Sequence, residues 1–378
     1  MTASAPWDLA PDLPWRHFGD PVRQWAEQPT FLVGELMFIA FAVVALLHAR
    51  RCGRDHVLTW VAALVAGTAN DLFFMALPLV DNFWQAQATI MITPRLPLYI
   101  PCVYVCFMYV PTIAVSRLGL PTLPRAAATG LVAALFYAPY DIVGAKFLLW
   151  TWHDTDLPIA HRILGAPIGS TMWVATFVAA FAWLLQRGMG RDVTSPRFVR
   201  ALAFVALGST PIMMLQLTVL QQLDGGVPGP IGLVTLATID LVVVVYAWPR
   251  RSPRPRADDR PLLAAVAIYF ATLALLMLAF DPATHRSTGI HQTHGECGVE
   301  QTDITGQVRH EFLCVADFDE DFTFDCLDAP PTGSGRWYTV CGRAHTRRGL
   351  HVGALFGLAA LGIALFGFML RARGGKTD

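Results

Sequence analysis

Two stretches of the sequence decide the fold class: FLVGELMFIAFAVVALLHA at residues 31–49 and PLLAAVAIYFATLALLMLAF at residues 261–280. Each is almost wholly apolar and has about the 20 residues that an α-helix needs to cross hydrocarbon. With seven similar stretches, the predicted spans lie near residues 31–49, 57–80, 97–117, 126–150, 164–186, 199–222, 229–248, 261–280 and 350–370. The sequence therefore predicts an all-α transmembrane protein, a polytopic helical bundle of about nine spans.

The composition agrees with this class. Only 15% of the 378 residues are charged, whereas soluble proteins contain roughly 25%. The 28 basic and 28 acidic side chains balance, so we expect membrane lipids as partners and no nucleic acid. The first 30 residues lack a basic segment followed by an apolar core, so we expect no cleaved signal peptide.

Basic residues predict the orientation of the spans. They gather in alternate connections: Arg50, Arg51 and Arg54; Arg117 and Arg125; Arg187, Arg191, Arg197 and Arg200; Arg250, Arg251, Arg254, Arg256 and Arg260; and Arg371, Arg373 and Lys376. Because cytoplasmic loops carry such an excess, these connections are predicted to be cytoplasmic, in a cell-membrane protein with its N-terminus outside. The alternative that omits the sixth span places two basic loops on the wrong side.

These spans divide the chain into five parts. We predict an external N-terminal segment, an eight-helix membrane bundle, an external cysteine-containing domain, a ninth transmembrane helix and a cytoplasmic tail, at residues 1–30, 31–280, 281–349, 350–370 and 371–378. The external domain has short alternating runs such as RHEFLCV and GRWYTVC, which are typical of β-strands. It is therefore expected to be a small, disulfide-stapled, β-rich cap.

The cysteines support an external position for this domain. Four of the seven lie in it: Cys297, Cys314, Cys326 and Cys341. Two disulfides are expected outside the cytosol, and the sequence leaves three pairings open. Cys102 and Cys106 are expected to be packed thiols, and Cys52 is expected to remain a thiol in a basic loop.

Polar residues inside the spans mark the candidate site, because burying an ionisable group in hydrocarbon costs several kcal/mol unless the group is paired or hydrated. They are Glu35, Asn70, Asp71, Asp141, Lys146 and Asp240. In the predicted orientation most of them lie in the outer half of the bilayer, which favours one pocket open to the outer face. The alternative is that they only join helices to one another.

The densest polar segment is YAPYDIVGAKFLLWTWHDTDLPIAHRILGAPIGSTMW at residues 137–173. Together with the polar residues of the spans, it supplies the predicted catalytic residues Asp141, Asp71, Glu35, His153 and Asp154. The predicted substrate-binding residues are Tyr137, Tyr140, Asn70, Lys146, Trp152, Asp156, His161 and Arg162. A buried Asp can act as a general acid, and His can exchange protons near neutral pH.

No metal site is predicted. The His and Asp residues of the 153–162 loop have no standard ligand spacing. The acidic run at 317–328 resembles a calcium loop, but Phe322 replaces the required Gly. The histidines of the external domain, including His285 and His291, are expected to be solvated, and no cofactor motif is present.

Two resemblances rest on the segment from Asp141 to Trp173. With its WHDTD run, it resembles an uncharacterised family of multi-pass membrane proteins. The order of Asp141, Trp150, Trp152, the GAP turn at 165–167 and Trp173 is also similar to membrane hydratases of carotenoid biosynthesis. The second likeness covers about a tenth of the chain, and the cysteine-bearing domain departs from it. It implies only that Asp141 and Asp71 be tested first.

The sequence thus predicts a membrane protein that binds or modifies an apolar lipid or isoprenoid by acid–base chemistry. The pocket would open to the outer half of the bilayer. Two alternatives stay open: a proton- or solute-coupled transporter whose path is lined by carboxylates, and a receptor or assembly factor that acts through its external domain.

Overall fold

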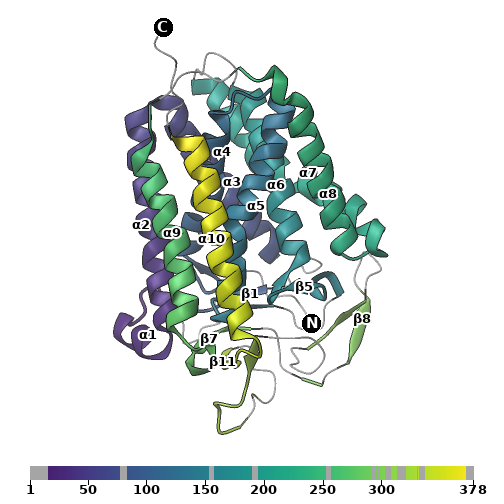
Figure 1. Cartoon of the computed structure of the whole chain (residues 1–378). Coiled ribbons are helices and arrows are strands. Elements are labelled where there is room, and N and C mark those ends of the chain that lie inside the picture. The colour runs from purple at the N-terminus through teal and green to yellow at the C-terminus, as the bar shows by residue number, and fades with distance from the viewer. Residues whose placement is uncertain are drawn as a thin grey trace.

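The structure is a bundle of long helices with small β-sheets gathered at one end (Figure 1). This computed structural model describes residues 16–76, 83–152, 157–189, 195–252, 257–291, 295–296, 298–302, 308–312, 321–329, 331 and 337–371. Within these ranges, nine helices are long and apolar enough to cross a membrane. They are α2 (Pro29–Cys52), α3 (Arg54–Ala76), α4 (Tyr99–Ser116), α5 (Thr122–Lys146), α6 (Ile168–Met189), α7 (Ser195–Gln221), α8 (Pro230–Ala247), α9 (Arg260–Ala279) and α10 (Arg348–Leu370).

The outer faces of these helices suit lipid better than water. Leu207 of α7 is 76% exposed and Val234 of α8 is 64% exposed, and large apolar side chains are exposed along both helices. So large an apolar surface is unusual on a soluble monomer. The chain is therefore an integral multi-pass membrane protein, as its composition predicts.

Helix α5 packs against α4, α6, α8, α9 and α10. Gly130 allows α5 to approach α6 closely, because a Cβ there would overlap the carbonyl oxygen of Ala175. On the other side of α5, the rings of Phe136 and Tyr269 stack with centroids 4.2 Å apart. Small residues and interlocked rings are how helices associate where lipid removes the hydrophobic driving force.

One predicted boundary needs correction. The fourth span, predicted at 126–150, is helical over Thr122–Lys146. The chain then turns, with Leu148 at a φ of 58°, and enters a strand at Trp150. A positive φ is unfavourable for a residue with a Cβ and ends the helix, although the apolar pattern continues past it.

The strands gather at one end of the bundle, which we call the cap end (Figure 1). Two-stranded antiparallel sheets pair β1 (Phe83–Gln85) with β4 (Trp150–Trp152), β2 (Met91–Thr93) with β3 (Leu96–Pro97), β5 (Arg162–Ile163) with β6 (Ala166–Pro167), and β8 (Glu300–Thr302) with β9 (Val308–His310). A three-stranded sheet has the order β10 (Phe322–Thr323), β11 (Trp337–Gly342), β7 (Arg286–Ile290). The predicted β-rich character of the cap is confirmed.

A disulfide between Cys326 and Cys341 staples this three-stranded sheet. It confirms one of the two predicted bonds. Cys297 and Cys314 lie outside the described residues. The Cys102 side chain is half-buried and Cys106 is fully buried in α4, as expected for packed thiols.

Buried polar contacts fasten the cap to the helices. Lys146, the last residue of α5, places its Nζ 2.7 Å from Oδ1 of Asp321. The Thr30 hydroxyl of α2 lies 2.6 Å from Nε2 of His285. Because each contact joins a helix end to the cap, the cap sheet has a fixed position over the bundle.

At the opposite end, which we call the basic end, the arginine-rich connections meet one another. Arg117 donates to the carbonyl of Met369 at 3.0 Å, and the amide of Ser252 donates to Gly119 at 2.9 Å. Alternate connections therefore share one end, as the predicted topology requires. Which side of the membrane this end faces stays a prediction from the positive-inside pattern.

Candidate functional site

A cavity of about 700 Å³ opens in the cap half of the bundle. Residues of α3, α4, α5, α6 and α7 form its sides, and β1 and β4 contribute Gln85 and Trp150. This volume lies within the roughly 300–1,000 Å³ of small-molecule sites in proteins. The cavity thus has room for one ligand of moderate size.

A chain of hydrogen bonds forms the polar part of the wall. The Thr210 hydroxyl of α7 donates to Oδ1 of Asn70 at 2.9 Å, and Nδ2 of Asn70 donates to the Tyr104 hydroxyl at 3.2 Å. That hydroxyl in turn donates to Oδ1 of Asp71 at 3.2 Å. Three helices thereby orient one carboxylate at the cavity surface, since Asn70, Asp71 and Tyr104 all line it.

Aromatic rings form most of the remaining wall. Trp173 of α6 lies at their centre, with ring centroids 5.9 Å from Tyr137 and 6.0 Å from Tyr104. Tyr140 continues the series toward Trp150, 5.1 Å away. Gly144 makes room for Trp150, because a Cβ at Gly144 would overlap the indole ring. The result is a rigid, largely apolar surface with polar edges.

Several polar atoms of these rings lack a protein partner. Within the described ranges, the indole nitrogens of Trp150, Trp152 and Trp173 are buried without a hydrogen bond, and the Tyr140 hydroxyl has the Tyr99 hydroxyl as a polar neighbour but makes no hydrogen bond of ordinary geometry. All four residues line the cavity. Buried Tyr and Trp side chains normally find acceptors, so these donors point to a ligand or water that carries acceptor oxygens.

Asp141 lies one layer behind this wall. It is 1% exposed, and neither carboxylate oxygen makes a hydrogen bond of ordinary geometry to the described part of the chain. Ser170, which lines the cavity, is a polar neighbour of the carboxylate. Asp141 itself does not line the cavity, so its contact with the site runs through Ser170.

Of the predicted site residues, the structure brings Asn70, Asp71, Tyr137, Tyr140 and Trp152 together around this cavity. His153, Asp154 and Asp156 lie outside the described residues. Their predicted roles stay predictions.

Glu35, Lys146, His161 and Arg162 do not line the cavity. The Glu35 carboxylate accepts the backbone amides of Thr89 at 3.0 Å and Ile90 at 3.1 Å, so it holds the turn before β2. Lys146 pairs with the cap. His161 is exposed, and Nε of Arg162 donates to the carbonyl of Ile159 at 3.0 Å. The contacts of Glu35, Lys146 and Arg162 therefore join parts of the fold to one another.

Two histidines of the cap differ from the expectation that they are solvated. His285 is fully buried and His291 is 1% exposed. His291 Nδ1 lies 3.0 Å from the Thr151 hydroxyl of β4. Burial lowers the pKa of His285 to about 4 and that of His291 to about 3. Because burial disfavours the charged imidazole, both are neutral near pH 7.

Sequence reasoning missed Tyr104 and Gln85 as wall residues, and Thr210 as a hydrogen-bond partner of the wall residue Asn70. Tyr104 carried a usable signal, because a hydroxyl within a membrane span needs a partner and Asn70 and Asp71 are candidates for it. Thr210 and Gln85 carried none, because their positions depend on how α7 and β1 pack.

The family comparison covers nearly the whole chain. A family model described as a domain of unknown function, DUF7802, matches residues 15–222 and 230–371. No curated protein and no solved structure matches the chain significantly. The matched ranges include every described residue of the cavity wall except Gly225 to Pro228.

Proposed function

Because the chain belongs to the DUF7802 family, whose function is unknown, its activity has to be inferred from the site: we propose that it binds an apolar lipid or isoprenoid in the cavity. The observation that carries the proposal is the wall of aromatic rings with buried donors lacking protein acceptors. Rings suit a hydrocarbon chain, and the donors suit an oxygen-bearing end such as a hydroxyl, carbonyl or phosphate.

In this proposal the carboxylates supply acid–base chemistry to the bound molecule. Asp71 is held at the cavity surface by Tyr104 and is placed to exchange a proton with the ligand. Asp141 is 1% exposed, does not line the cavity and has Ser170, a residue of the cavity wall, as its polar neighbour. Asp71 is therefore the first candidate for direct contact, and Asp141 for a proton reserve reached through Ser170.

A transport function receives less support from the same geometry. Glu35 is fully occupied by the turn before β2. Asp240, on α8, is half-buried and does not line the cavity. A carboxylate path would require these two groups to join Asp71 and Asp141, and the described contacts do not connect them.

The binding proposal is tested by recovering the ligand. The chain is purified from host membranes in mild detergent, and bound molecules are extracted and identified by mass spectrometry. A lipid-like molecule is expected at near one per chain in the natural protein and at reduced occupancy in Trp173→Ala. Trp183→Ala is the matched control, because Trp183 lies on the same helix outside the cavity. Equal occupancy in both variants would contradict the proposal.

The chemical part of the proposal needs a second comparison. Lipid extracts of cells that express the natural chain are compared with extracts from Asp71→Asn and Asp141→Asn cells. Conversion should be lost in Asp71→Asn and strongly reduced in Asp141→Asn. Asp240→Asn should match the natural chain. If ligand binds but no lipid changes with expression, the protein is a binder rather than an enzyme.

A further inference from the structure

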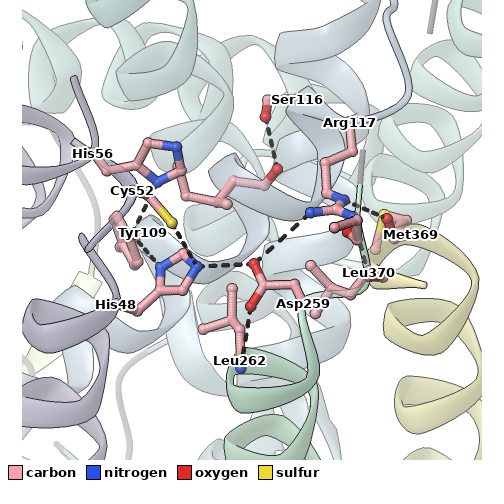
Figure 2. A network of polar contacts seen from close by, with 12 residues as sticks. His48, Cys52, His56, Tyr109, Ser116, Arg117, Asp259, Leu262, Met369 and Leu370 are labelled. Atoms are coloured by element: carbon pink, nitrogen blue, oxygen red, sulfur yellow. Dashed lines mark hydrogen bonds and ion pairs between the residues drawn. The ribbon is translucent and has the colours of Figure 1, made fainter. Parts of the chain in front are cut away.

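A second polar cluster lies at the basic end, far along the helices from the cavity. It contains His48 near the end of α2, Cys52 at its last residue, His56 in the first turn of α3 and Asp259 at the start of α9 (Figure 2). His48 and Cys52 share a helix face by their i, i+4 spacing. Gly53, at a φ of 109°, reverses the chain so that α3 returns His56 to the same place.

The distances within this cluster are those of a metal site. One ligand atom from each of His48, Cys52 and His56 can be chosen so that all lie within 4.8 Å of one another. The Cys52 sulfur is 3.3 Å from Nε2 of His48, and Oδ2 of Asp259 is 2.8 Å from the same nitrogen. A tetrahedral ion with bonds of about 2.0–2.3 Å holds its ligand atoms about 3.3–3.8 Å apart. Small side-chain rotations would therefore close the site.

We propose that His48, Cys52 and His56 bind a divalent ion of the zinc class, and that Asp259, which hydrogen-bonds to His48, moves in as the fourth ligand when the ion binds. Thiolate and imidazole together select zinc over magnesium or calcium, which prefer oxygen ligands alone. The thiolate and the carboxylate balance the two charges of the ion. The exposed position of Cys52 and the half-buried position of His56 give the ion a route from solvent.

Tyr109 of α4 supports the ligands from behind. Its hydroxyl lies 2.7 Å from Nδ1 of His48, which leaves Nε2 of that imidazole facing Cys52 and Asp259. Metal-binding histidines usually hold their second nitrogen in this way. The same hydroxyl lies 3.2 Å from Nδ1 of His56, so one phenol fixes both rings.

Arginine side chains near the cluster oppose the binding of a metal ion. Nη1 of Arg117 lies 3.8 Å from Oδ2 of Asp259, and Arg50, Arg51 and Arg54 flank Cys52 in the sequence. These cations repel a metal ion at long range. Binding therefore depends on direct bonds to the thiolate and imidazoles, and loss of either ligand type should remove it.

The test uses the full-length chain without a histidine tag, purified in detergent and depleted of metal with a chelator. Cobalt(II) is titrated as a spectroscopic probe, and zinc(II) is then added to displace it. The natural chain should bind one cobalt ion, with the absorption of a tetrahedral site and a sulfur-to-cobalt charge-transfer band. Zinc should abolish both signals.

Variants separate the site from adventitious binding. Cys52→Ser should lose the charge-transfer band, and His56→Ala should lose tetrahedral binding. Tyr109→Phe should weaken binding about 10- to 100-fold. Cys102→Ser and His17→Ala are matched controls away from the cluster and should bind as the natural chain does. A natural chain that binds no cobalt, or a Cys52→Ser variant that keeps the charge-transfer band, would overturn the proposal.

Discussion

The two ends of the helical bundle handle buried polar groups in opposite ways. At the cap end, three indole nitrogens that line the cavity have no acceptor in the described structure, and the Tyr140 hydroxyl makes no hydrogen bond of ordinary geometry. At the basic end, His48, Tyr109 and Asp259 are joined by contacts of 2.7 and 2.8 Å. At the cap end, hydrogen-bond donors surround a cavity. At the basic end, nitrogen, sulfur and oxygen atoms that can bind a metal ion lie close to one another.

This difference suggests two kinds of occupant. A cavity of about 700 Å³ with separated donors suits a molecule with a long apolar part. A compact group of nitrogen, sulfur and oxygen atoms suits a single ion. The same membrane bundle therefore provides a large site at one end and a small one at the other, and the two can be disturbed independently.

The largest expected loss of stability comes from breaking the ion pair between Lys146 and Asp321, which joins the cap to α5. Lys146→Met leaves the Asp321 carboxylate buried without its cation, which should destabilise the fold by about 3–5 kcal/mol. The double variant Lys146→Met with Asp321→Leu should recover most of that loss. Thermal unfolding in detergent measures both. An equal loss in the single and double variants would show that the ion pair does not hold the cap.

Removing the disulfide should have the next largest effect. Cys326 and Cys341 have a sequence separation of 15. Replacing both with Ser should lower the free energy of unfolding by about 3 kcal/mol, because the unfolded chain gains conformational entropy when the loop is no longer closed. The loss should be confined to the cap end. Hydrogen exchange should speed up in β7 and β11 and stay unchanged at the start of α9. Faster exchange at both ends would mean that the ends are not independent.

Mild acid should loosen the cap by a somewhat smaller amount. The pKa values of His285 and His291, about 4 and about 3, lie below the ordinary value near 6.5. The unfolded chain therefore binds more protons as pH falls below 6.5. The stability given by the neutral histidines is complete above that pH and decreases as the pH falls toward 4. We expect a loss of roughly 2 kcal/mol per histidine between pH 7 and pH 5.

Melting temperatures measured across this range test the pH prediction. His285→Asn and His291→Asn should make the pH dependence shallower, because neither replacement titrates. His345, whose pKa burial also lowers to about 4, should supply the slope that remains. A slope as steep in the double Asn variant as in the natural chain would assign the pH dependence to other groups.

The smallest expected effect on stability is that of Tyr140→Phe. Its hydroxyl makes no hydrogen bond of ordinary geometry and has only Tyr99 as a polar side-chain neighbour, so its removal should change the free energy of unfolding by less than about 1 kcal/mol in either direction. Ligand occupancy should nevertheless fall, since a donor is lost. A large loss of stability with unchanged occupancy would show that this hydroxyl serves the fold.

Much of the fold could be predicted from the sequence, because length and apolarity alone specify a membrane span. The β-rich cap also followed from its alternating runs. The strand at Trp150 did not, because the apolar pattern of α5 continues through the turn at Leu148. Local hydropathy cannot distinguish the last turn of a helix from a strand that packs on its end.

The site was predictable in part. Asn70 and Asp71 were predicted because unpaired polar groups are costly in hydrocarbon, and Tyr137 and Tyr140 because they lie in the polar segment 137–173; all four line the cavity. Glu35 met the same criterion but holds a turn, and only the folded chain shows its partners. The spacing of His48, Cys52 and His56 was visible in the sequence, yet its meaning depends on Gly53 reversing the chain.

The connection between α7 and α8 has a consequence for access to the cavity. Gly225 and Gly226 line it with φ values of 79° and 98°, and nothing lies within 4 Å of where their side chains would be. Hydrogen bonds hold this stretch in place: the amide of Gly226 donates to the carbonyl of Gln221 at 2.9 Å, and the Asp224 carboxylate accepts the amides of Ile231 at 3.0 Å and Gly232 at 2.7 Å. Because neither glycine carries a side chain, the backbone itself forms this part of the cavity wall, and a bulkier residue there would narrow the space that a ligand has to enter.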